Sequence, residues 1–152
     1  MSELDELDRK ILRELQRDCA IPVEELGDRI GLSRNACWRR VKRLEADGYI
    51  TARVALVDPA KVGLGLEVFI AVKTDAHDPD WLDKFARAMR DVPAVIGAYR
   101  MTGELDYLIR ARVGDIKDYD ALYQQLIRRV PMSDVSASFV MEEIKEVTAL
   151  PV

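Results

Sequence analysis

The side chains between residues 34 and 43 have the chemistry to bind an anionic polymer. This run contains five cations and no carboxylate, namely Arg34, Arg39, Arg40, Lys42 and Arg43. On a helix with about 100° between residues, most of these cations fall with Asn35 and Ala36 on or near one side, and Arg40 lies on a flank. In the DNA major groove, guanidinium groups pair with guanine edges, an amide pairs with adenine, and cations contact phosphates. The run therefore predicts a DNA-contacting surface, and an ordinary solvated basic face is the alternative.

Three helices would position this surface. Helical spacing predicts a first helix with one apolar side, made of Leu4, Leu7, Ile11, Leu12 and Leu15. Pro22 opens a second, short helix that ends at Gly31. Ser33 is a good N-cap for a third helix that runs to about Asp47 and ends at Gly48. Two helices joined by a tight turn form a helix-turn-helix, which favours DNA binding over a merely solvated face.

The other side of the third helix should pack on the first two helices. It carries Cys37, Val41 and Leu44. Trp38 lies nearer this side, so we expect it to pack in the core rather than contact bases. Cys37 is expected to be a small, inert core residue, with redox sensitivity as the alternative because cations surround it.

The second half of the chain predicts a different kind of domain. Residues 49–57 (YITARVALV) have the pattern of a strand, either a wing or the start of a connection, and Asp58-Pro59 and two glycines place a boundary near residues 58–65. Strands and helices then alternate as β-α-β-β-α-β, over residues 67–74, 78–91, 94–101, 105–113, 115–130 and 134–147. This order is typical of ferredoxin-like domains. The predicted fold class is α+β, with an N-terminal winged helix-turn-helix (1–50), a linker strand and hinge (51–65), and a C-terminal αβ domain (66–152).

Composition excludes several other classes of protein. The chain has 152 residues, of which 49% are hydrophobic and 33% charged, which is typical of a globular protein. Its apolar runs are shorter than the roughly 18 residues that a membrane-spanning helix needs. The charged first residues are unlike a secretory signal, so we expect a cytoplasmic protein without a membrane partner. The net charge of −4 does not exclude DNA, because one face can carry the phosphate contacts.

Neither a metal site nor a catalytic site is expected. Cys19 and Cys37 have no second cysteine or histidine at metal-ligand spacing, and His77 is the only histidine. The sequence has no phosphate-binding GxxxxGK[ST] motif and no GxSxG nucleophile motif. Its carboxylates are scattered as in a solvated surface, so an enzyme is not expected.

Several separated motifs resemble the Lrp/AsnC family of regulators. These are LDELDRKILRELQRD and VEELGDRIGLSRNACWRRVKRLEADGYI in the first half, and VALVDPAKVGLGL, MTGELDYLIRARV and the final ALPV in the second. The resemblance covers essentially the whole chain. NACWRRVKRLEADG, YRMTGELDYL and DVSASFVMEEIK are similar to the DecR-like subgroup, which is associated with L-cysteine.

The resemblance implies a DNA-binding transcriptional regulator with an amino-acid effector. It implies homodimers formed through the sheets, assembly into octamers, and effector binding near the contact between dimers. The candidate DNA-binding residues, which the third helix already indicates, are Ser33, Arg34, Asn35, Arg39, Arg40, Lys42 and Arg43. The implied effector-binding residues are Met101, Thr102, Gly103, Glu104 and Asp106 in one turn and Ser133, Asp134 and Ser136 in a second segment. No other cofactor is expected, and L-cysteine is the first candidate effector.

Three alternatives remain open, one for the effector turn, one for the function and one for two arginines of the sheet. In the turn, Gly103 could let backbone amides approach a carboxylate and Asp106 could hold an α-ammonium group, but the same residues also suit a plain hairpin turn. At the level of function, the alternative is an architectural DNA-binding protein without a metabolite effector. In the third predicted strand, Arg110 and Arg112 lie on the face away from the helices, where they would either pair with carboxylates of a partner subunit or be solvated.

Overall fold

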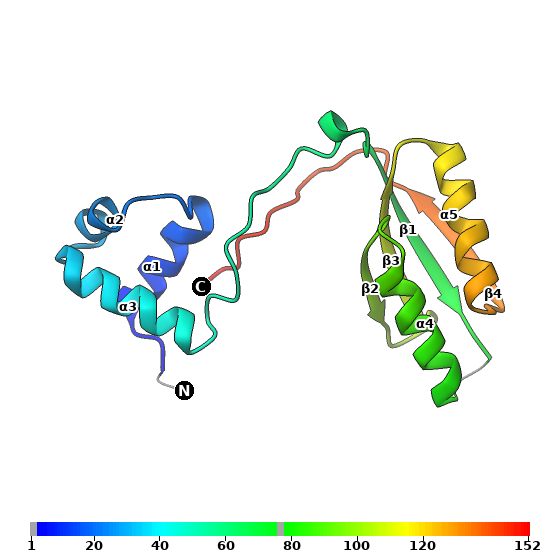
Figure 1. Ribbon diagram of the computed structural model, residues 1–152, viewed down its shortest axis with the longest axis horizontal. Coiled ribbons are helices and arrows are strands. Elements are labelled where there is room, and N and C mark those ends of the chain that lie inside the picture. The colour runs from blue at the N-terminus through cyan, green and yellow to red at the C-terminus, as the bar shows by residue number, and fades with distance from the viewer. Residues whose placement is uncertain (1–2, 76–77) are drawn as a thin grey trace. The chain divides into compact units, whose positions relative to one another are not determined.

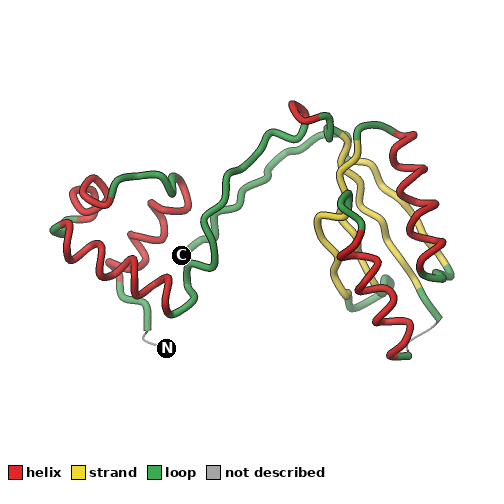
Figure 2. The backbone as a smooth tube through the Cα atoms, viewed as in Figure 1, coloured by secondary structure: helices red, strands yellow, loops and turns green. Residues whose placement is uncertain are grey.

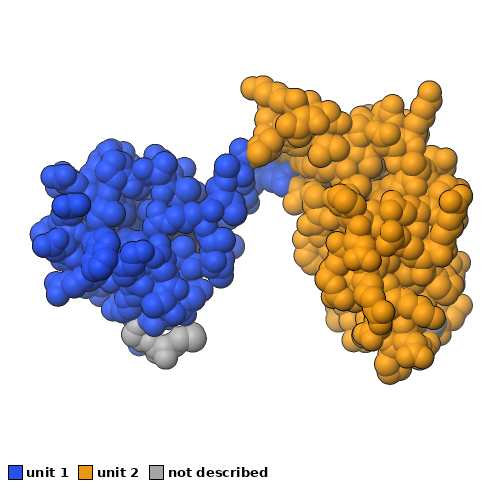
Figure 3. Space-filling model, in the orientation of Figure 1, with its two compact units in different colours: residues 1–56, 145–152 blue, residues 57–144 orange. Residues whose placement is uncertain are grey.

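The structure is a computed structural model that describes residues 3–75 and 78–152. It divides into two compact units, which Figure 3 shows in different colours. Unit 1 comprises residues 1–56 and 145–152, and unit 2 comprises residues 57–144. No helix in the described part of the chain is both long and apolar enough to cross a membrane.

Unit 1 contains the three predicted helices, α1 (Glu6–Arg17), α2 (Val23–Ile30) and α3 (Arg34–Ala46), shown in Figure 1. Asp5 caps α1 and α2 ends at Gly31 in the left-handed conformation, which a residue without Cβ adopts readily. Between the helices lies one apolar core, whose buried members are Ile11, Leu12, Ile21, Leu26, Ile30, Cys37, Val41 and Leu44. The prediction of a three-helix unit packed through Cys37, Val41 and Leu44 is confirmed.

The end of the chain packs on unit 1. The backbone N–H of Leu150 donates to Oε1 of Gln16 at 2.6 Å, and Nε2 of Gln16 donates to the carbonyl of Leu150 at 3.2 Å. Val152 packs against the core of the three helices. The sequence analysis assigned the whole of 66–152 to the second domain, whereas residues 145–152 lie in unit 1 because of these contacts.

One segment that the sequence predicted as a strand is not a strand in the structure, and another ends earlier than predicted. Residues 51–57 pair with no neighbouring strand in the described chain, and Figure 2 draws them as loop. The final strand, predicted over 134–147, ends at Phe139. Its last partner on the neighbouring strand is Val68, and one further hydrogen bond joins Val140 N–H to the Glu67 carbonyl. The ladder stops there because the neighbouring strand begins at Leu66.

Unit 2 has the predicted β-α-β-β-α-β order. A short 3-10 helix, η1 (Ala60–Val62), precedes β1 (Leu66–Lys73), α4 (Pro79–Asp91), β2 (Val95–Arg100), β3 (Tyr107–Val113), α5 (Ile116–Arg129) and β4 (Asp134–Phe139). The sheet has the strand order β2-β3-β1-β4, and all neighbours are antiparallel. This is the ferredoxin-like arrangement, so the predicted α+β fold class is confirmed.

The core of unit 2 lies between the sheet and its two helices. Alternate residues of β1 and β3 are buried, as the period of a strand requires, and they meet α4 and α5. Trp81 and Phe85 of α4 stack with their ring centroids 5.1 Å apart, and Tyr107 lies 4.4 Å from Phe85 by the same measure. The indole N–H of Trp81 donates to the Pro131 carbonyl at 2.7 Å, so this buried polar group is satisfied.

The opposite face of the sheet carries Arg110 and Arg112, as predicted. Both pair with Glu67 of β1, a buried carboxylate of the same chain; Nη2 of Arg112 lies 3.2 Å from its Oε2. Nη2 of Arg112 also lies 3.6 Å from Oε2 of Glu143. The sequence analysis weighed a partner subunit against solvent for these arginines; within this chain, Glu67 of the neighbouring strand and Glu143 supply carboxylates.

Candidate DNA-binding surface and effector turn

Helix α3 presents the first group of predicted site residues. The hydroxyl of Ser33 accepts the Ala36 N–H at 3.3 Å and so caps the helix. Arg34, Asn35, Arg39 and Lys42 are exposed together with Ser33. In the described part of the chain, Arg34 and Arg39 form no ion pair, whereas Lys42 lies 2.8 Å from Oε2 of Glu45. The exposed residues therefore extend from the N-terminus of α3 along the side opposite its core.

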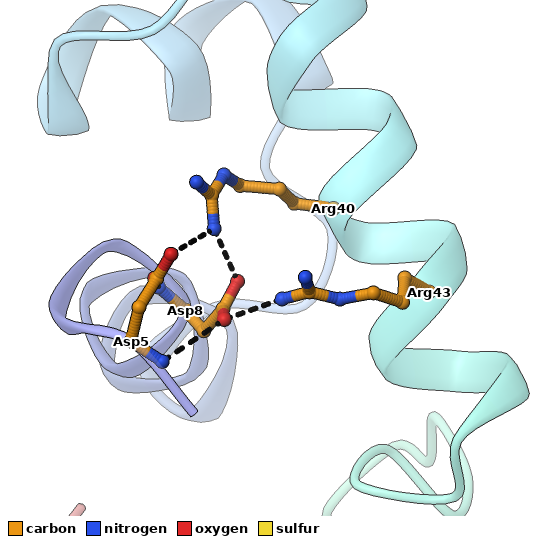
Figure 4. Close-up of polar contacts among 4 residues, drawn as sticks. All are labelled: Asp5, Asp8, Arg40 and Arg43. Atoms are coloured by element: carbon orange, nitrogen blue, oxygen red, sulfur yellow. Dashed lines mark hydrogen bonds and ion pairs between the residues drawn. The ribbon is translucent and has the colours of Figure 1, made fainter. Parts of the chain in front are cut away.

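Arg40 and Arg43 have different surroundings from the other α3 cations. Nη1 of Arg40 lies 2.6 Å from Oδ2 of Asp5 and 2.8 Å from Oδ1 of Asp8. Nη2 of Arg43 bonds to the other carboxylate oxygen of Asp8 (Figure 4). The sequence analysis placed both arginines in the DNA-contacting set, and the structure brings both against the start of α1.

These contacts shift the pKa values of the groups involved. The pKa of Asp5 is lowered to about 2, chiefly because its carboxylate accepts the backbone N–H of Asp8, and secondly because it accepts a hydrogen bond from Arg40. The same pairing, with the hydrogen bond to Asp5 as the larger cause and that to Asp8 as the smaller, raises the pKa of Arg40.

Burial raises the pKa of the Cys37 thiol, which disfavours the reactive thiolate and agrees with a structural role in the core.

Asp8 is a functional candidate that the sequence analysis did not identify. It is fully buried, yet it lies among the apolar residues of α1. Asp8 stands four residues after Leu4 and four before Leu12, on the predicted apolar side of the helix. A carboxylate on the apolar side of a helix is the feature that could have identified Asp8 from the sequence, because a buried charge needs a partner of opposite charge.

Trp38 was predicted to pack in the core, and this prediction is wrong. Its exposed fraction is 51%. On the helix it lies about 100° from Cys37, at the edge of the buried side, where Val41 and Leu44 already fill the contact with the other helices. An exposed tryptophan on the same helix as the exposed cations is available to a ligand of that surface.

A shallow hollow of about 390 Å³ lies beside α3. It is lined by Leu32, Ala36, Arg39, Arg40 and Arg43. The Nε of Arg43 is buried and has no hydrogen-bond partner among the described residues. The lining of the hollow thus combines three guanidinium side chains of α3 with the apolar side chains of Ala36 and Leu32.

The predicted effector turn joins β2 to β3. Residues 101–104 are exposed, and Gly103 has a φ of +105°, a conformation that L side chains rarely adopt. Asp106 is half-buried, and its Oδ2 accepts the backbone N–H of Thr74 at 2.8 Å. Asp106 is the residue predicted to hold the α-ammonium group, and one of its carboxylate oxygens already accepts a hydrogen bond from Thr74, just after β1.

The second group of predicted effector residues lies on the other side of β1. Ser133 donates both its N–H and its hydroxyl to the carbonyl of Lys73, at 3.2 and 3.0 Å. In the register of β4 with β1, Asp134 pairs with Lys73 and Ser136 with Ala71. Because β1 lies between β3 and β4, the two groups flank its C-terminal end, roughly 10 Å apart at two strand spacings.

Each unit also contains a larger hollow. In unit 1, a hollow of about 520 Å³ lies between α1, residues 49–56 and the end of the chain, and its lining includes Cys19 and Arg53. In unit 2, a hollow of about 430 Å³ lies between α4 and the edge strand β2, lined by Phe85, Met89 and Tyr99 among others. The unit 2 hollow reaches Arg100 and Tyr107, which adjoin the effector turn on either side.

Two family models match successive parts of the chain. Residues 4–45 match the AsnC-type helix-turn-helix domain. Residues 67–150 match the Lrp/AsnC ligand binding domain. The first match covers α1, α2 and nearly all of α3, and the second covers the sheet, both of its helices and the turn at residues 101–106.

The chain is similar over nearly its full length to known regulators. It is 49% identical to a glutamate uptake regulatory protein of Zymomonas mobilis, over 98% of this chain and 91% of the relative. It is 46% identical to the DNA-binding transcriptional activator DecR of Escherichia coli, over 98% and 99%. Among solved structures, it resembles a Neisseria meningitidis transcriptional regulator in complex with L-Met, with a TM-score of 0.94, 37% identity and coverage of 98% and 97%.

Proposed function

The chain belongs to the Lrp/AsnC family of transcriptional regulators, and on this basis we propose that exposed residues of α3 read the sequence of its DNA sites and that a small amino acid modulates the binding. The protein is a DNA-binding regulator with a ligand-binding domain. The family consists of regulators and not of enzymes.

One observation carries the assignment of DNA contacts. The N-terminal half of α3 is capped by Ser33, and it presents Arg34, Asn35 and Arg39 to solvent without an ion-pair partner among the described residues. In helix-turn-helix proteins, the N-terminal residues of the second helix of the motif contact base edges in the major groove. We assign base contacts to these three residues, and phosphate contacts to Ser33 and Lys42, on the same surface.

Replacing Arg39 tests this assignment. The probes are the tightest-binding duplex that the wild-type protein selects from a random 20-base-pair pool, and poly(dI-dC) as non-specific DNA. Arg39→Ala should weaken binding to the selected duplex by about 1–3 kcal/mol, the value of one good base contact, and should reduce the preference over poly(dI-dC).

The matched control is Arg13→Ala. Arg13 is an arginine of α1 that pairs with Glu6 at 2.6 Å. The Arg13→Ala variant should show the same preference for the selected duplex over poly(dI-dC) as the wild type. Equal loss of affinity for both DNAs in Arg39→Ala would instead assign Arg39 to phosphates.

The effector is proposed to bind at the turn of residues 101–104 and at Asp106, Ser133, Asp134 and Ser136. The positive φ of Gly103 supports this position because it leaves backbone N–H groups accessible to a carboxylate. The remaining oxygen of Asp106 would accept the α-ammonium group. L-cysteine is the first ligand to test, with L-methionine and L-leucine as alternatives.

The proposed assembly is a homodimer formed through the sheets, and dimers joined into an octamer with the effector between them. A regulator of double-stranded DNA of this kind would work in the cytoplasm. Light scattering of the full-length protein, with and without L-cysteine, would measure the assembly. A monomer under both conditions would contradict the proposal.

Calorimetry under reducing conditions tests the effector site. Gly103→Ala should lower the affinity for the amino acid, because the alanine strains the turn and crowds the ligand. Gly63→Ala is the matched control, since Gly63 also has a positive φ (+77°) and open space around its Cβ position. Unchanged affinity in Gly103→Ala would move the site away from the turn.

The alternative is an architectural DNA-binding protein that no metabolite regulates. The same amino acids should then produce neither heat nor stabilisation. An effector that acts on DNA binding must be bound with a different affinity when DNA is present, by the same factor, because coupling is reciprocal. Titration of the amino acid with and without the selected duplex separates the two functions.

A further inference from the structure

Some cations of α3 form an ion pair with a carboxylate of the same unit, and others do not. Five cations lie between residues 34 and 46. Three of them have carboxylate partners, namely Arg40, Lys42 and Arg43. Arg34 and Arg39 have none among residues 3–75 and 78–152. Only Lys42 is paired within α3, because its partner is Glu45.

The carboxylates that hold Arg40 and Arg43 are themselves fixed by the backbone. Asp5 and Asp8 form a capping box, in which Asp8 N–H donates to Oδ1 of Asp5 at 2.8 Å and Asp5 N–H donates to Oδ2 of Asp8 at 3.2 Å. Asp8 is fully buried and accepts hydrogen bonds from both guanidinium groups. The side chains of Asp5, Asp8, Arg40 and Arg43 thus form a closed cluster of two negative and two positive charges, visible in Figure 4. We call it the α1–α3 cluster.

The charge balance of the α1–α3 cluster affects the affinity for non-specific DNA, because this affinity depends on cations that no carboxylate of the protein neutralises. A protein that neutralises phosphates releases counterions, and log K changes by about 0.9 per phosphate contact for each unit of log salt. A guanidinium group already paired with a buried carboxylate releases fewer counterions when it approaches a phosphate. The half-exposed carboxylate of Asp5 would also repel that phosphate.

We propose that Asp5 and Asp8 are specificity-determining residues: they hold Arg40 and Arg43 against α1 and thereby keep two of the five α3 cations from neutralising DNA phosphates. This inference rests on the proposed DNA contacts of α3. Binding at any DNA site would then depend mainly on the uncompensated residues of the exposed side, which include the proposed base readers. Asp5 and Asp8 act through the arginines and do not themselves touch DNA.

The salt dependence of binding to poly(dI-dC) gives the most direct test. On this non-specific DNA the proposed base reader Arg39 has no selected base to bind and faces phosphates, so Arg39→Gln should reduce the slope of log K against log salt by about 0.9. Arg40→Gln should leave the slope close to that of the wild type. Equal reductions in the two variants would overturn the proposal, because Arg40 would then neutralise a phosphate as Arg39 does.

Asp5→Asn tests the carboxylate without endangering the fold. Asparagine is as good an N-cap as aspartate, so α1 keeps its cap while Arg40 loses one of its two partners. Non-specific binding should become tighter, and the slope should become steeper by up to about 0.9. The preference for the selected duplex should decrease. Adding Arg40→Gln to Asp5→Asn should restore the wild-type slope.

Glu6→Gln is the matched control for charge. Glu6 lies next to Asp5 in the first turn of α1 and pairs with Arg13 of the same helix, so this variant removes the same charge without affecting α3. The increase in slope should be larger in Asp5→Asn than in Glu6→Gln. Equal increases would show a general charge effect and would overturn the proposal.

Asp8→Asn completes the test with the buried carboxylate. It should release both arginines and steepen the slope more than Asp5→Asn does, in protein shown by its unfolding curve to be folded. A purely structural role predicts a different result, namely equal loss of affinity for both DNAs at an unchanged slope. Weaker binding to both DNAs in Asp5→Asn, with its fold intact, would also overturn the proposal. Failure of the wild type to bind any DNA would instead contradict the proposed function.

Discussion

At the scale of single residues, the two tryptophans report on different units of the molecule. Trp38 is 51% exposed on α3, whereas Trp81 is 4% exposed in the core of unit 2. The emission of the wild-type protein should therefore combine a red-shifted and a blue-shifted component, and Trp38→Phe should remove the red-shifted one. Addition of the selected duplex should change the emission of the wild type but not that of Trp38→Phe. A DNA-dependent change that persists in Trp38→Phe would place the DNA contact away from this part of α3.

The depressed pKa of Asp5 predicts a specific acid sensitivity. Its value is about 2 in the folded chain, against an ordinary value of 3.8. A carboxyl group whose pKa is lower in the folded state stabilises the fold above its unfolded value, and this contribution is lost as the pH falls from about 4 to 2. Urea unfolding of unit 1 between pH 5 and pH 2, followed by Trp38 emission, should show a smaller loss of stability in Asp5→Asn than in the wild type. Identical losses would mean that Asp5 titrates alike in both states.

Single residues of α1 and α3 also mark the limit of sequence reasoning. The helical spacing of Cys37, Val41 and Leu44 was enough to predict the buried side of α3. It could not predict Trp38, because a residue at the edge of that side is buried or exposed according to what the other helices already fill. Nor could it predict that Asp8 bonds to Arg40 and Arg43, which lie 32 and 35 positions away. Such pairs depend on tertiary packing and leave no local pattern.

At the scale of elements, Asp106 links the turn before β3 to the end of β1. Its Oδ2 accepts the N–H of Thr74, a buried residue. Asp106→Ala should destabilise unit 2 by about 1–3 kcal/mol, because it leaves that N–H without its partner. Thermal or urea unfolding followed by Trp81 emission would measure the change. Glu104→Ala is the control, since Glu104 is an exposed acid of the same turn, and a comparable loss in both variants would contradict a role for the hydrogen bond.

The elements with a clear period were predicted well, and those without tertiary partners were not. Residues 105–113 largely alternate between apolar and polar in the sequence, and residues 67–74 hold a short apolar run, which is also typical of a strand; β1 and β3 follow within two residues of these bounds. Residues 51–57 and 140–147 have strand-like composition but form no strand. A strand requires a neighbour to bond with, and the composition of a segment does not reveal whether one is present. The two groups of effector residues could be assigned only by resemblance to a family, and their positions on either side of β1 depend on the strand order.

At the scale of the whole molecule, the last eight residues should contribute to the stability of unit 1. Their contacts include the two hydrogen bonds between Leu150 and Gln16, and Val152 packs on the helical core. A chain ending at residue 144 should lose about 1–3 kcal/mol in unit 1, from two hydrogen bonds of about 0.5–1.5 kcal/mol each. Unfolding monitored by Trp38 should shift, while the transition monitored by Trp81 stays in place. Gln16→Ala in the full chain should reproduce the hydrogen-bond part of the loss, and an unchanged Trp38 transition in both variants would contradict the prediction.

The return of the chain's end to unit 1 has a consequence for synthesis on the ribosome. The helices of unit 1 are made first, but residues 145–152 are made only after the whole of unit 2. The ribosome adds about 5–20 residues each second, so the three helices wait several seconds for the segment that completes their packing. We therefore expect nascent chains stalled before residue 145 to present an unfinished DNA-binding unit, and full contact between Gln16 and Leu150 to form only once residues 145–152 have left the ribosome. Coupling of this kind would give the DNA-binding unit its final stability only in chains translated beyond unit 2.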